Sequence, residues 1–187
     1  LSDNDLQIYK KRGLWAIINA GSNSKLASGI CDVQKMSNMG INLAVGTDGP
    51  SSNNALDMFR EMYLISVLQK LKYNDAAAMD ANEILKAATS GSAKCMGLTD
   101  CDCIAEGKLA DLMIIDLERP NMQPINNITK NLVYSGSKDD VKMTMINGKI
   151  LYENGEFVNI DKEEIYAKAQ EICNRLKNKC IKKASQS

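Results

Sequence analysis

The sequence predicts an α/β protein in which a parallel α/β part is followed by an antiparallel, β-rich part. In residues 1–97, short apolar runs alternate with amphipathic segments at helical spacing, which is the rhythm of parallel α/β units. Beyond this point, strands with alternating polarity are joined by Asn-Gly turns, which favour antiparallel hairpins. We therefore expect three regions: an α/β region over 1–97, a β-rich region over 98–160, and a C-terminal helix and tail over 161–187.

The first elements are predicted from local signals. Ser2 can cap a helix that runs to about Arg12, and Gly13 ends it. The next residues, 14–19, form a continuous apolar run, as expected for a strand that is covered on both faces. The same reasoning predicts the remaining elements of this region: helices over 30–39, 54–71 and 80–97, and a strand over 41–45.

The second region is predicted from its turns. Residues 112–117 form a continuous apolar strand, and residues 142–146 alternate in polarity before the Asn147-Gly148 turn. Residues 149–153 are the expected return strand, followed by a second Asn-Gly turn. In the last region, Asp161 and Glu164 are expected to cap a helix to about Lys179, and residues 182–187 are expected to be a frayed tail.

Composition excludes several classes of partner. The chain has 187 residues, and 23 basic side chains balance 23 acidic ones, so no net field attracts nucleic acid or an anionic membrane. No apolar run approaches the roughly 20 residues that span a bilayer. Residues 1–5 lack the features of a signal peptide. We therefore expect a cytoplasmic protein.

The chain contains no histidine, the usual ligand of a catalytic zinc or iron. Metal chemistry must therefore come from Asp, Glu or Cys, or from residues outside the chain. Cys95, Cys101 and Cys103 cluster closely enough to suggest a thiolate metal site. A structural zinc site takes four ligands, however, and no fourth is indicated, so free or buried thiols are the favoured interpretation.

The most specific chemical signal is the segment 46–54, Gly-Thr-Asp-Gly-Pro-Ser-Ser-Asn-Asn, directly after the second strand. A polar residue at the C-terminal end of a barrel strand faces the active site, and flanking glycines let the backbone approach a ligand. Asp48 is therefore a candidate metal ligand or base. A turn aspartate that caps the following helix is the alternative. Asp57 is expected on the exposed side of that helix.

The residues after the first strand, 22–26, give a weaker signal. They can form a loop held by side-chain-to-backbone hydrogen bonds, or the rim of a pocket to which Ser22 and Asn23 contribute substrate contacts. The loop interpretation is favoured on residue type alone.

Together, several segments resemble the amidohydrolase superfamily, most closely the 5-methylthioadenosine/S-adenosylhomocysteine deaminases and the triazine chlorohydrolases. The resemblance runs in order along nearly the whole chain. The segments are Ser22-Asn23-x-Lys25-Leu26-Ala27-Ser28-Gly29, Gly46-Thr47-Asp48-Gly49, Ser52-Asn53-Asn54, Asp57-Met58-Phe59, Glu61-Met62, Ala93-x-x-Met96-Gly97, Ile104-Ala105-Glu106-Gly107-Lys108-x-Ala110-Asp111-Leu112 and Ile146-Asn147-Gly148-Lys149.

This resemblance implies a fold and an activity. The fold is the C-terminal part of a (β/α)8 amidohydrolase barrel, with its final strands, plus part of a small flanking β-sandwich. The activity is the hydrolytic removal of ammonia from an adenine-type or related small-molecule amine, a C–N bond other than a peptide bond. In the family, the aspartate at the position of Asp48 completes a mononuclear zinc or iron site and carries a proton during the reaction.

The chain also departs from the family. The metal-binding histidines and the glutamate of the family lie before the position of Leu1, and Ile18-Asn19-Ala20 replaces a histidine-containing segment. A histidine often seen near Tyr134 is absent as well. We therefore expect the chain alone to be inactive and to hold no metal tightly. A non-catalytic remnant or half-barrel interaction module is the alternative. In either case an open sheet edge favours a homo-oligomer or a complementing N-terminal half.

Overall fold

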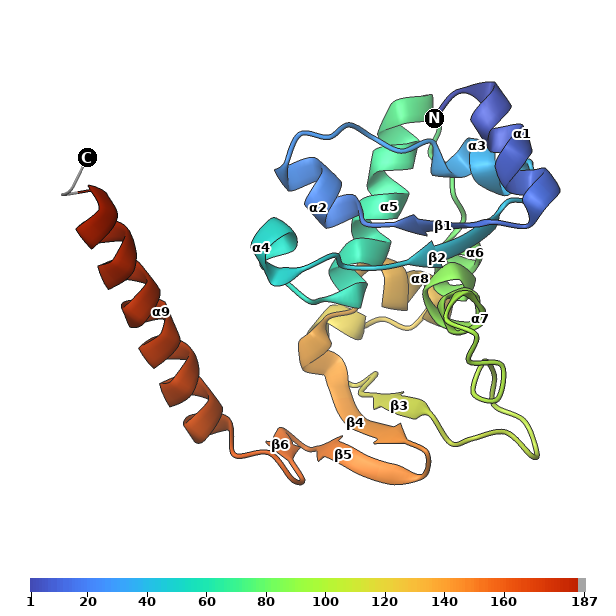
Figure 1. The fold of residues 1–187 in the computed structure, drawn as a ribbon. Helices are drawn as coiled ribbons and strands as arrows, with labels where there is room; N and C mark the ends of the chain where they lie inside the picture. Colours follow the sequence, from blue (N-terminus) through green and yellow to red (C-terminus); the bar gives the residue numbers. More distant parts are fainter. Residues whose placement is uncertain (185–187) are drawn as a thin grey trace.

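The computed structural model describes residues 1–184, with side chains described to residue 179 (Figure 1). It contains a two-stranded parallel sheet surrounded by helices and a four-stranded antiparallel sheet. The predicted α/β class is confirmed. Along the chain, the first 97 residues contain α1 (Asp3–Arg12), β1 (Trp15–Ile18), α2 (Ala20–Lys25), α3 (Val33–Asn38), β2 (Asn42–Val45), α4 (Pro50–Asn53), α5 (Met58–Tyr73), α6 (Ala81–Lys86), the π-helical turn η1 (Ala87–Gly91) and α7 (Ser92–Cys95).

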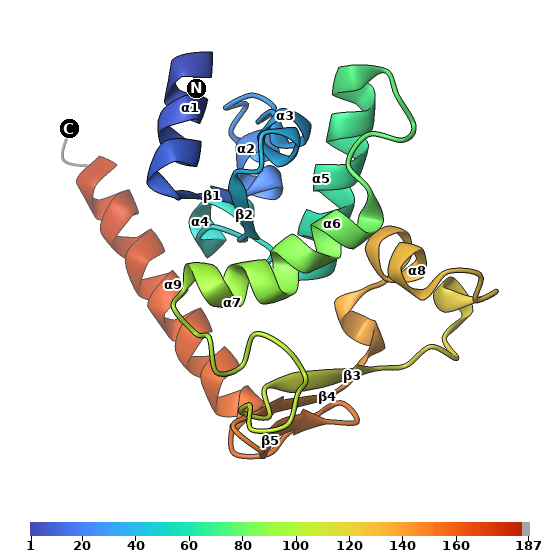
Figure 2. The same cartoon turned by 90° about the vertical axis from the view of Figure 1, so that its right-hand side faces the viewer.

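The rest of the described chain contains the antiparallel sheet and two further helices. Its strands have the order β3-β4-β5-β6, and Figure 2 shows this sheet below α6 and α7. The last helix projects away from the other elements (Figure 1). The elements are β3 (Leu112–Ile115), η2 (Pro120–Met122), α8 (Ile128–Tyr134), η3 (Lys138–Asp140), β4 (Val141–Ile146), β5 (Lys149–Glu153), β6 (Glu156–Phe157) and α9 (Lys162–Ala184).

Local signals fix the ends of α1 and the hairpin between β4 and β5. The Ser2 and Asp5 side chains cap each other's backbone N–H groups at the start of α1, and Gly13 ends the helix in the left-handed region, with φ of 63°. Asn147 and Gly148 both have positive φ, as a type I′ turn requires. These predicted elements are confirmed.

The parallel sheet pairs Trp15 with Asn42 and Ile18 with Val45, so the C-terminal ends of β1 and β2 lie at the same edge. A core of apolar side chains from the sheet and its helices supports them, and it includes Ile65 on α5 and the fully buried Ile84 on α6. This core holds the loops that follow the two strands.

The continuous helical stretch α6–η1–α7 passes close to β2. A Cβ at Gly91 would lie 2.5 Å from the carbonyl oxygen of Leu43, so only glycine permits this approach. The Ser92 hydroxyl lies 3.1 Å from the backbone nitrogen of Val45 and 3.2 Å from its carbonyl oxygen. Ser92 therefore takes the place of a neighbouring strand along this edge of β2.

Four local predictions are wrong. Residues 22–25 are helical rather than a loop, because they form the end of α2. The helix predicted over 54–71 begins at Met58, after a separate short helix, α4. Asp57 is half-buried rather than exposed: it caps α5 by accepting hydrogen bonds from the backbone nitrogens of Phe59 and Arg60.

The fourth error concerns the tail predicted over 182–187: residues 182–184 belong to α9, while residues 185–187 lie outside the described residues. The helix α8 was not predicted either. It packs against α5 and α6, where Val133 is buried and the Tyr134 hydroxyl lies 3.0 Å from that of Ser66. The division near residue 97 remains a prediction. In the part of the chain that the structure describes, no helix is long and apolar enough to cross a membrane.

Candidate functional site

The site forms where the two parallel strands end. Ser22 lies in α2, directly after β1, and Asp48 lies in the loop after β2. Because parallel strands end at the same edge of their sheet, these two residues, 26 positions apart in sequence, come together. The Ser22 hydroxyl donates to Oδ2 of Asp48 over 2.7 Å. The structure thus brings together two of the three predicted site residues.

Asp48 retains room for a ligand. Its Oδ1 accepts a hydrogen bond of 2.7 Å from the backbone nitrogen of Gly49, and its Oδ2 accepts the one from Ser22. An ionised carboxylate has about four acceptor positions, so these contacts do not use all of them. The side chain is exposed, and the carboxylate can therefore reach a cation or a water molecule.

Hydrogen bonds hold the pKa of Asp48 below its ordinary value. The Ser22 hydroxyl is the largest cause, followed by the Ser52 hydroxyl and the backbone N–H of Gly49. Each of them stabilises the ionised form. Asp48 is therefore a carboxylate at neutral pH, which is the form that ligates a metal or accepts a proton.

The backbone of Asp48 is strained. Its φ is 59°, in the left-handed region that non-glycine residues seldom adopt. The capping interpretation of Asp48 is wrong, because Gly49 is the residue at the N-cap of α4 and Asp48 precedes it. The left-handed turn instead points the carboxylate towards α2.

Behind Asp48 and Ser22 lies a buried polar cluster of three residues: Gly21, Asn53 and Glu61. Glu61, on α5, is fully buried and accepts hydrogen bonds of 2.8 Å from the backbone nitrogen of Gly21 and 2.7 Å from Nδ2 of Asn53. The same Nδ2 donates to the carbonyl oxygen of Thr47 over 2.6 Å. This cluster, called here the Glu61 cluster, ties both strand-end loops to α5.

A second link joins the same loops nearer the surface. Nζ of Lys25, at the end of α2, donates to the carbonyl oxygen of Ser51 over 3.2 Å and to Oδ1 of Asn54. Ser51 and Asn54 lie in or next to α4. The loop after β1 and the loop after β2 are therefore connected by both a buried and an exposed set of contacts.

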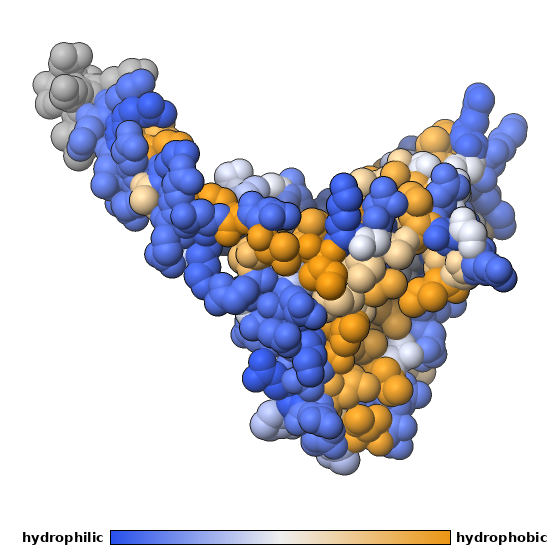
Figure 3. Space-filling model, turned by 90° about the horizontal axis from the view of Figure 1, so that it is seen from below, coloured by the Kyte–Doolittle hydropathy of each residue, from blue (hydrophilic) through white to orange (hydrophobic). Residues whose placement is uncertain are grey.

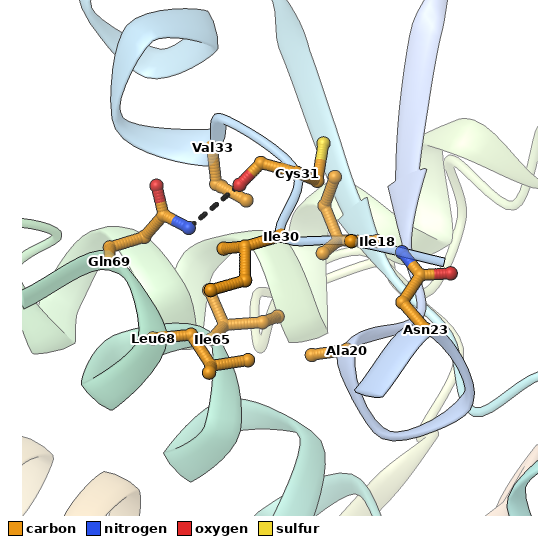
Figure 4. Close-up of a pocket in the computed structure, with 10 residues that line it drawn as sticks. Ile18, Ala20, Asn23, Ile30, Cys31, Val33, Ile65, Leu68 and Gln69 are labelled. Atoms are coloured by element: carbon orange, nitrogen blue, oxygen red, sulfur yellow. Dashed lines mark hydrogen bonds between the residues drawn. The ribbon is translucent and has the colours of Figure 1, made fainter. Parts of the chain in front are cut away.

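Asn23, the third predicted site residue, lies elsewhere. It lines a small apolar pocket beside Ile18 and Ala20 (Figure 4). Gln69 closes another side of this pocket and donates to the carbonyl oxygen of Cys31 over 2.8 Å. Asn23 thus lines this pocket, and its predicted role in substrate binding stays a prediction.

The described side chains do not form a complete metal site. Within the residues that the structure describes, no three or more Cys, Asp or Glu side chains are grouped to hold an ion. The thiols of Cys95, Cys101 and Cys103 are free, and Cys101 faces the carbonyl oxygen of Leu98. Asp48 fits a metal as one oxygen ligand, and other ligands have to come from outside the described chain.

Sequence reasoning missed the Glu61 cluster. Its members are separated by up to 40 positions, and no local pattern relates Gly21 to Glu61. One signal was present: a charged residue at position 61 interrupts the apolar face of α5, between Phe59 and Met62. A carboxylate on a buried helix face requires hydrogen-bond donors, and that requirement could have indicated the cluster.

Comparison with known proteins identifies the family of the chain. The "5-methylthioadenosine/S-adenosylhomocysteine deaminase" of Clostridium tetani is 40% identical over 179 residues, which are 95% of this chain and 42% of that protein. The crystal structure of a zinc-bound adenosine deaminase from Xanthomonas campestris matches with a TM-score of 0.92 and 35% identity, over 95% of this chain and 41% of that chain.

A zinc complex of the atrazine chlorohydrolase of Arthrobacter aurescens has the same fold over 91% of this chain and 38% of that chain, with a TM-score of 0.85 and 22% identity. The chain spans about two fifths of the length of these relatives. The amidohydrolase family model matches residues 1–151, which include both strand ends and the segment around Asp48. With more than half of its length matched, the chain belongs to the amidohydrolase family.

Proposed function

We propose that the chain is the C-terminal part of a metal-dependent deaminase that removes ammonia from an adenine-type nucleoside by the attack of water. The observation that carries this proposal is the placement of an ionised, accessible Asp48 at the end of β2, fixed by Ser22. The relatives are named as deaminases of adenosine and of adenosine derivatives, which supports this substrate class.

Asp48 has two tasks in the proposed reaction. One free position of its carboxylate would ligate the metal, zinc or iron, which when bound lowers the pKa of a coordinated water towards neutrality. Asp48 then takes a proton from the attacking water and delivers it to the departing amine. The water oxygen forms a bond to the ring carbon that carries the amine, the C–N bond breaks, and the amine leaves as ammonia. The Ser22 hydroxyl holds Oδ2 in place throughout.

The same proposal requires a complementing half. Under this proposal, β1 and β2 of this chain are the final strands of a (β/α)8 barrel, and its antiparallel sheet is part of the flanking sandwich. Ile17 on β1 is 56% exposed although it lies in a strand of the parallel sheet. The helix α9 projects away from the other elements (Figure 1), and its Ile165, Ile172 and Leu176 are exposed. These surfaces suit a protein part that brings the other metal ligands.

A non-catalytic interaction module is the second candidate. The observation that favours it is the amount of exposed apolar surface, which forms a band on the face seen in Figure 3. Exposed side chains of the antiparallel sheet include Met113, Ile114, Ile146 and Phe157. Large exposed apolar patches mark interaction sites, whether or not the assembled protein is an enzyme.

Complementation separates the two candidates. The chain is co-expressed with the part of the Clostridium tetani deaminase that precedes the matched region, and ammonia release from 5′-methylthioadenosine, S-adenosylhomocysteine and adenosine is measured with added zinc. We expect a complex with deaminase activity that a chelator abolishes and zinc or iron restores. A stable, metal-loaded complex without activity on any of the three substrates would favour the interaction module.

The chain alone gives two further tests. We expect it to lose zinc in dialysis against a weak chelator, because a single carboxylate does not replace the several ligands of a catalytic site. We also expect it to self-associate through the open sheet edges. Stoichiometric zinc after dialysis would contradict the first expectation, and a monodisperse monomer in sedimentation at micromolar concentration would contradict the second.

A further inference from the structure

Packing of the core does not by itself require a carboxylate at position 61. Burying a carboxylate costs free energy unless its oxygens are hydrogen-bonded, and an apolar side chain of similar volume would pack between Phe59 and Met62 at no such cost. Glu61 is nevertheless fully buried, and its two hydrogen bonds go to the two loops that carry the candidate site. Its oxygens therefore act on the loops rather than on the packing of α5.

The first contact fixes the loop after β1. Gly21 is the second residue of α2, and the N–H groups in the first turn of a helix have no acceptor within the helix. Oε2 of Glu61 supplies the acceptor for Gly21. A Cβ at position 21 would collide with Oε1 of Glu61, so the contact needs glycine. Because Ser22 follows directly, this bond sets the position from which its hydroxyl reaches Asp48.

The second contact fixes the loop after β2. The amide nitrogen of Asn53 donates both to Oε1 of Glu61 and to the carbonyl oxygen of Thr47, the residue before Asp48. Both partners of Nδ2 are acceptors, which fixes the orientation of the Asn53 amide. Its buried Oδ1 has no partner among the described residues, so the amide is retained here for its donors.

We propose that Glu61 is a positioning residue for the active site, which through Gly21 and Asn53 sets the separation of Ser22 and Asp48. The inference rests on the proposed function for the task of Asp48, while the contacts themselves do not depend on it. Glutamine has nearly the shape of glutamate but only one acceptor oxygen. In Glu61→Gln, the new amide group faces either the N–H of Gly21 or the amide of Asn53, and one of the two loops is released.

Nuclear magnetic resonance of the full 187-residue chain tests the proposal without any activity. We expect the amide proton of Gly21 in the unaltered chain to be strongly protected from exchange, although its position in the first turn of α2 gives it no acceptor within the helix. In Glu61→Gln, its exchange should accelerate by at least about tenfold, and the amide resonances of Ser22, Thr47 and Asp48 should shift.

The matched control is Ile65→Val, which removes one buried methyl group from the same helix and leaves the hydrogen-bonding groups of the cluster unchanged. If Glu61 served packing alone, the two variants would show the same pattern of amide chemical-shift changes when their losses of thermal stability are equal. Equal patterns would therefore overturn the proposal. If Glu61→Gln does not fold, the unaltered chain decides: an unprotected Gly21 amide would overturn the proposal and a protected one supports it.

The complemented enzyme gives a second readout. There we expect Glu61→Gln to lower kcat by at least about tenfold with KM nearly unchanged, since the variant misplaces the reacting carboxylate rather than the binding surface. An unchanged kcat would overturn the positioning role. Failure of the proposed function is distinguishable, because the unaltered complemented protein would then be inactive, while the magnetic resonance experiment would still report on the Glu61 cluster.

Discussion

The two sheets of this protein obtain their geometry in different ways. The parallel pair β1–β2 buries Ala16, Ile18, Ala44 and Val45, and contacts from distant parts of the sequence hold its strand ends. In the antiparallel sheet, Met143 is buried, and the other strand residues are half-buried or exposed. Tight Asn-Gly turns join β4 to β5 and β5 to β6.

This difference indicates where function can reside. A local turn fixes the path of the chain, while most side chains of the antiparallel sheet are half-buried or exposed. At the parallel strand ends, a serine, an asparagine and a glutamate from three elements restrain one loop, which is the restraint that a catalytic carboxylate needs. We therefore expect substitutions in the two regions to have unequal effects.

The largest difference is expected for two aspartates. In the complemented enzyme, Asp48→Asn keeps the size of the side chain and removes the proton acceptor, and it should lower kcat by at least about a hundredfold, within the usual range for a general acid or base. The control is Asp139→Asn, at an exposed position in η3 before the antiparallel sheet, which should change kcat little. Steady-state kinetics at saturating metal measures both. Near-normal activity of both variants, with metal bound, would show that Asp48 is not the catalytic carboxylate.

The second difference concerns the free energy of unfolding. Ile84 is fully buried beneath the parallel sheet, and Ile84→Ala should destabilise the chain by about 2–5 kcal/mol. Met113 on β3 is 49% exposed, and Met113→Ala should change stability by no more than about 0.5 kcal/mol. Urea unfolding followed by circular dichroism measures both values. Equal losses would mean that the antiparallel sheet is as tightly packed as the parallel one.

The same contrast explains which elements could be predicted from the sequence. The ends of α1 and the Asn147-Gly148 hairpin depend on residues that are adjacent in sequence, and both were predicted. Asp48 could be named as a candidate from the sequence because a polar residue after a buried strand is itself a local signal. The family resemblance added its metal-binding role, which remains a proposal.

The elements that were missed depend on distant contacts. Residues 20–25 contain glycine, two serines and an asparagine, which are weak helix formers, yet they form α2. The acceptor for one of its first N–H groups comes from Glu61 on α5, which no local pattern reveals. Pro50 is a recognisable first residue of α4, so that helix could have been predicted from its proline.

Two glycines sharpen the comparison further. Gly21→Ala in the parallel region should lower the free energy of unfolding by about 1–3 kcal/mol, because the new Cβ would collide with Glu61 and Asn53 in the buried cluster. Gly148→Ala in the hairpin meets no atom within 4 Å, and its cost of about 1–2 kcal/mol comes from a φ of 72° alone. Thermal unfolding compares the stabilities. A chemical-shift map should show a disturbance at Asp48 for the first variant and only local shifts for the second.

The smallest effect is expected at the surface, where α5 ends. The Tyr73 hydroxyl donates a hydrogen bond to Asp32. Burial alone would raise the pKa of Asp32, but the pKa is lowered, because this bond acts together with the N–H of Lys35 and the ammonium of Lys72. The same bond raises the pKa of Tyr73 to about 12. Since the folded pKa of Asp32 is depressed, its contribution to stability is present above the unfolded pKa of about 3.9 and is lost as the pH falls through the folded value.

For Tyr73 the sign is reversed. Its folded pKa is raised, so its contribution is present below about pH 10 and is lost as the pH rises towards 12. Tyr73→Phe should therefore lower the free energy of unfolding at pH 7 by no more than about 1.5 kcal/mol, the usual net value of one hydrogen bond. The difference in the free energy of unfolding between Tyr73→Phe and the unaltered chain should become smaller both below pH 4 and above pH 10. Urea unfolding across this range measures the gap, and a constant gap would show that the phenol contributes by packing and not through Asp32.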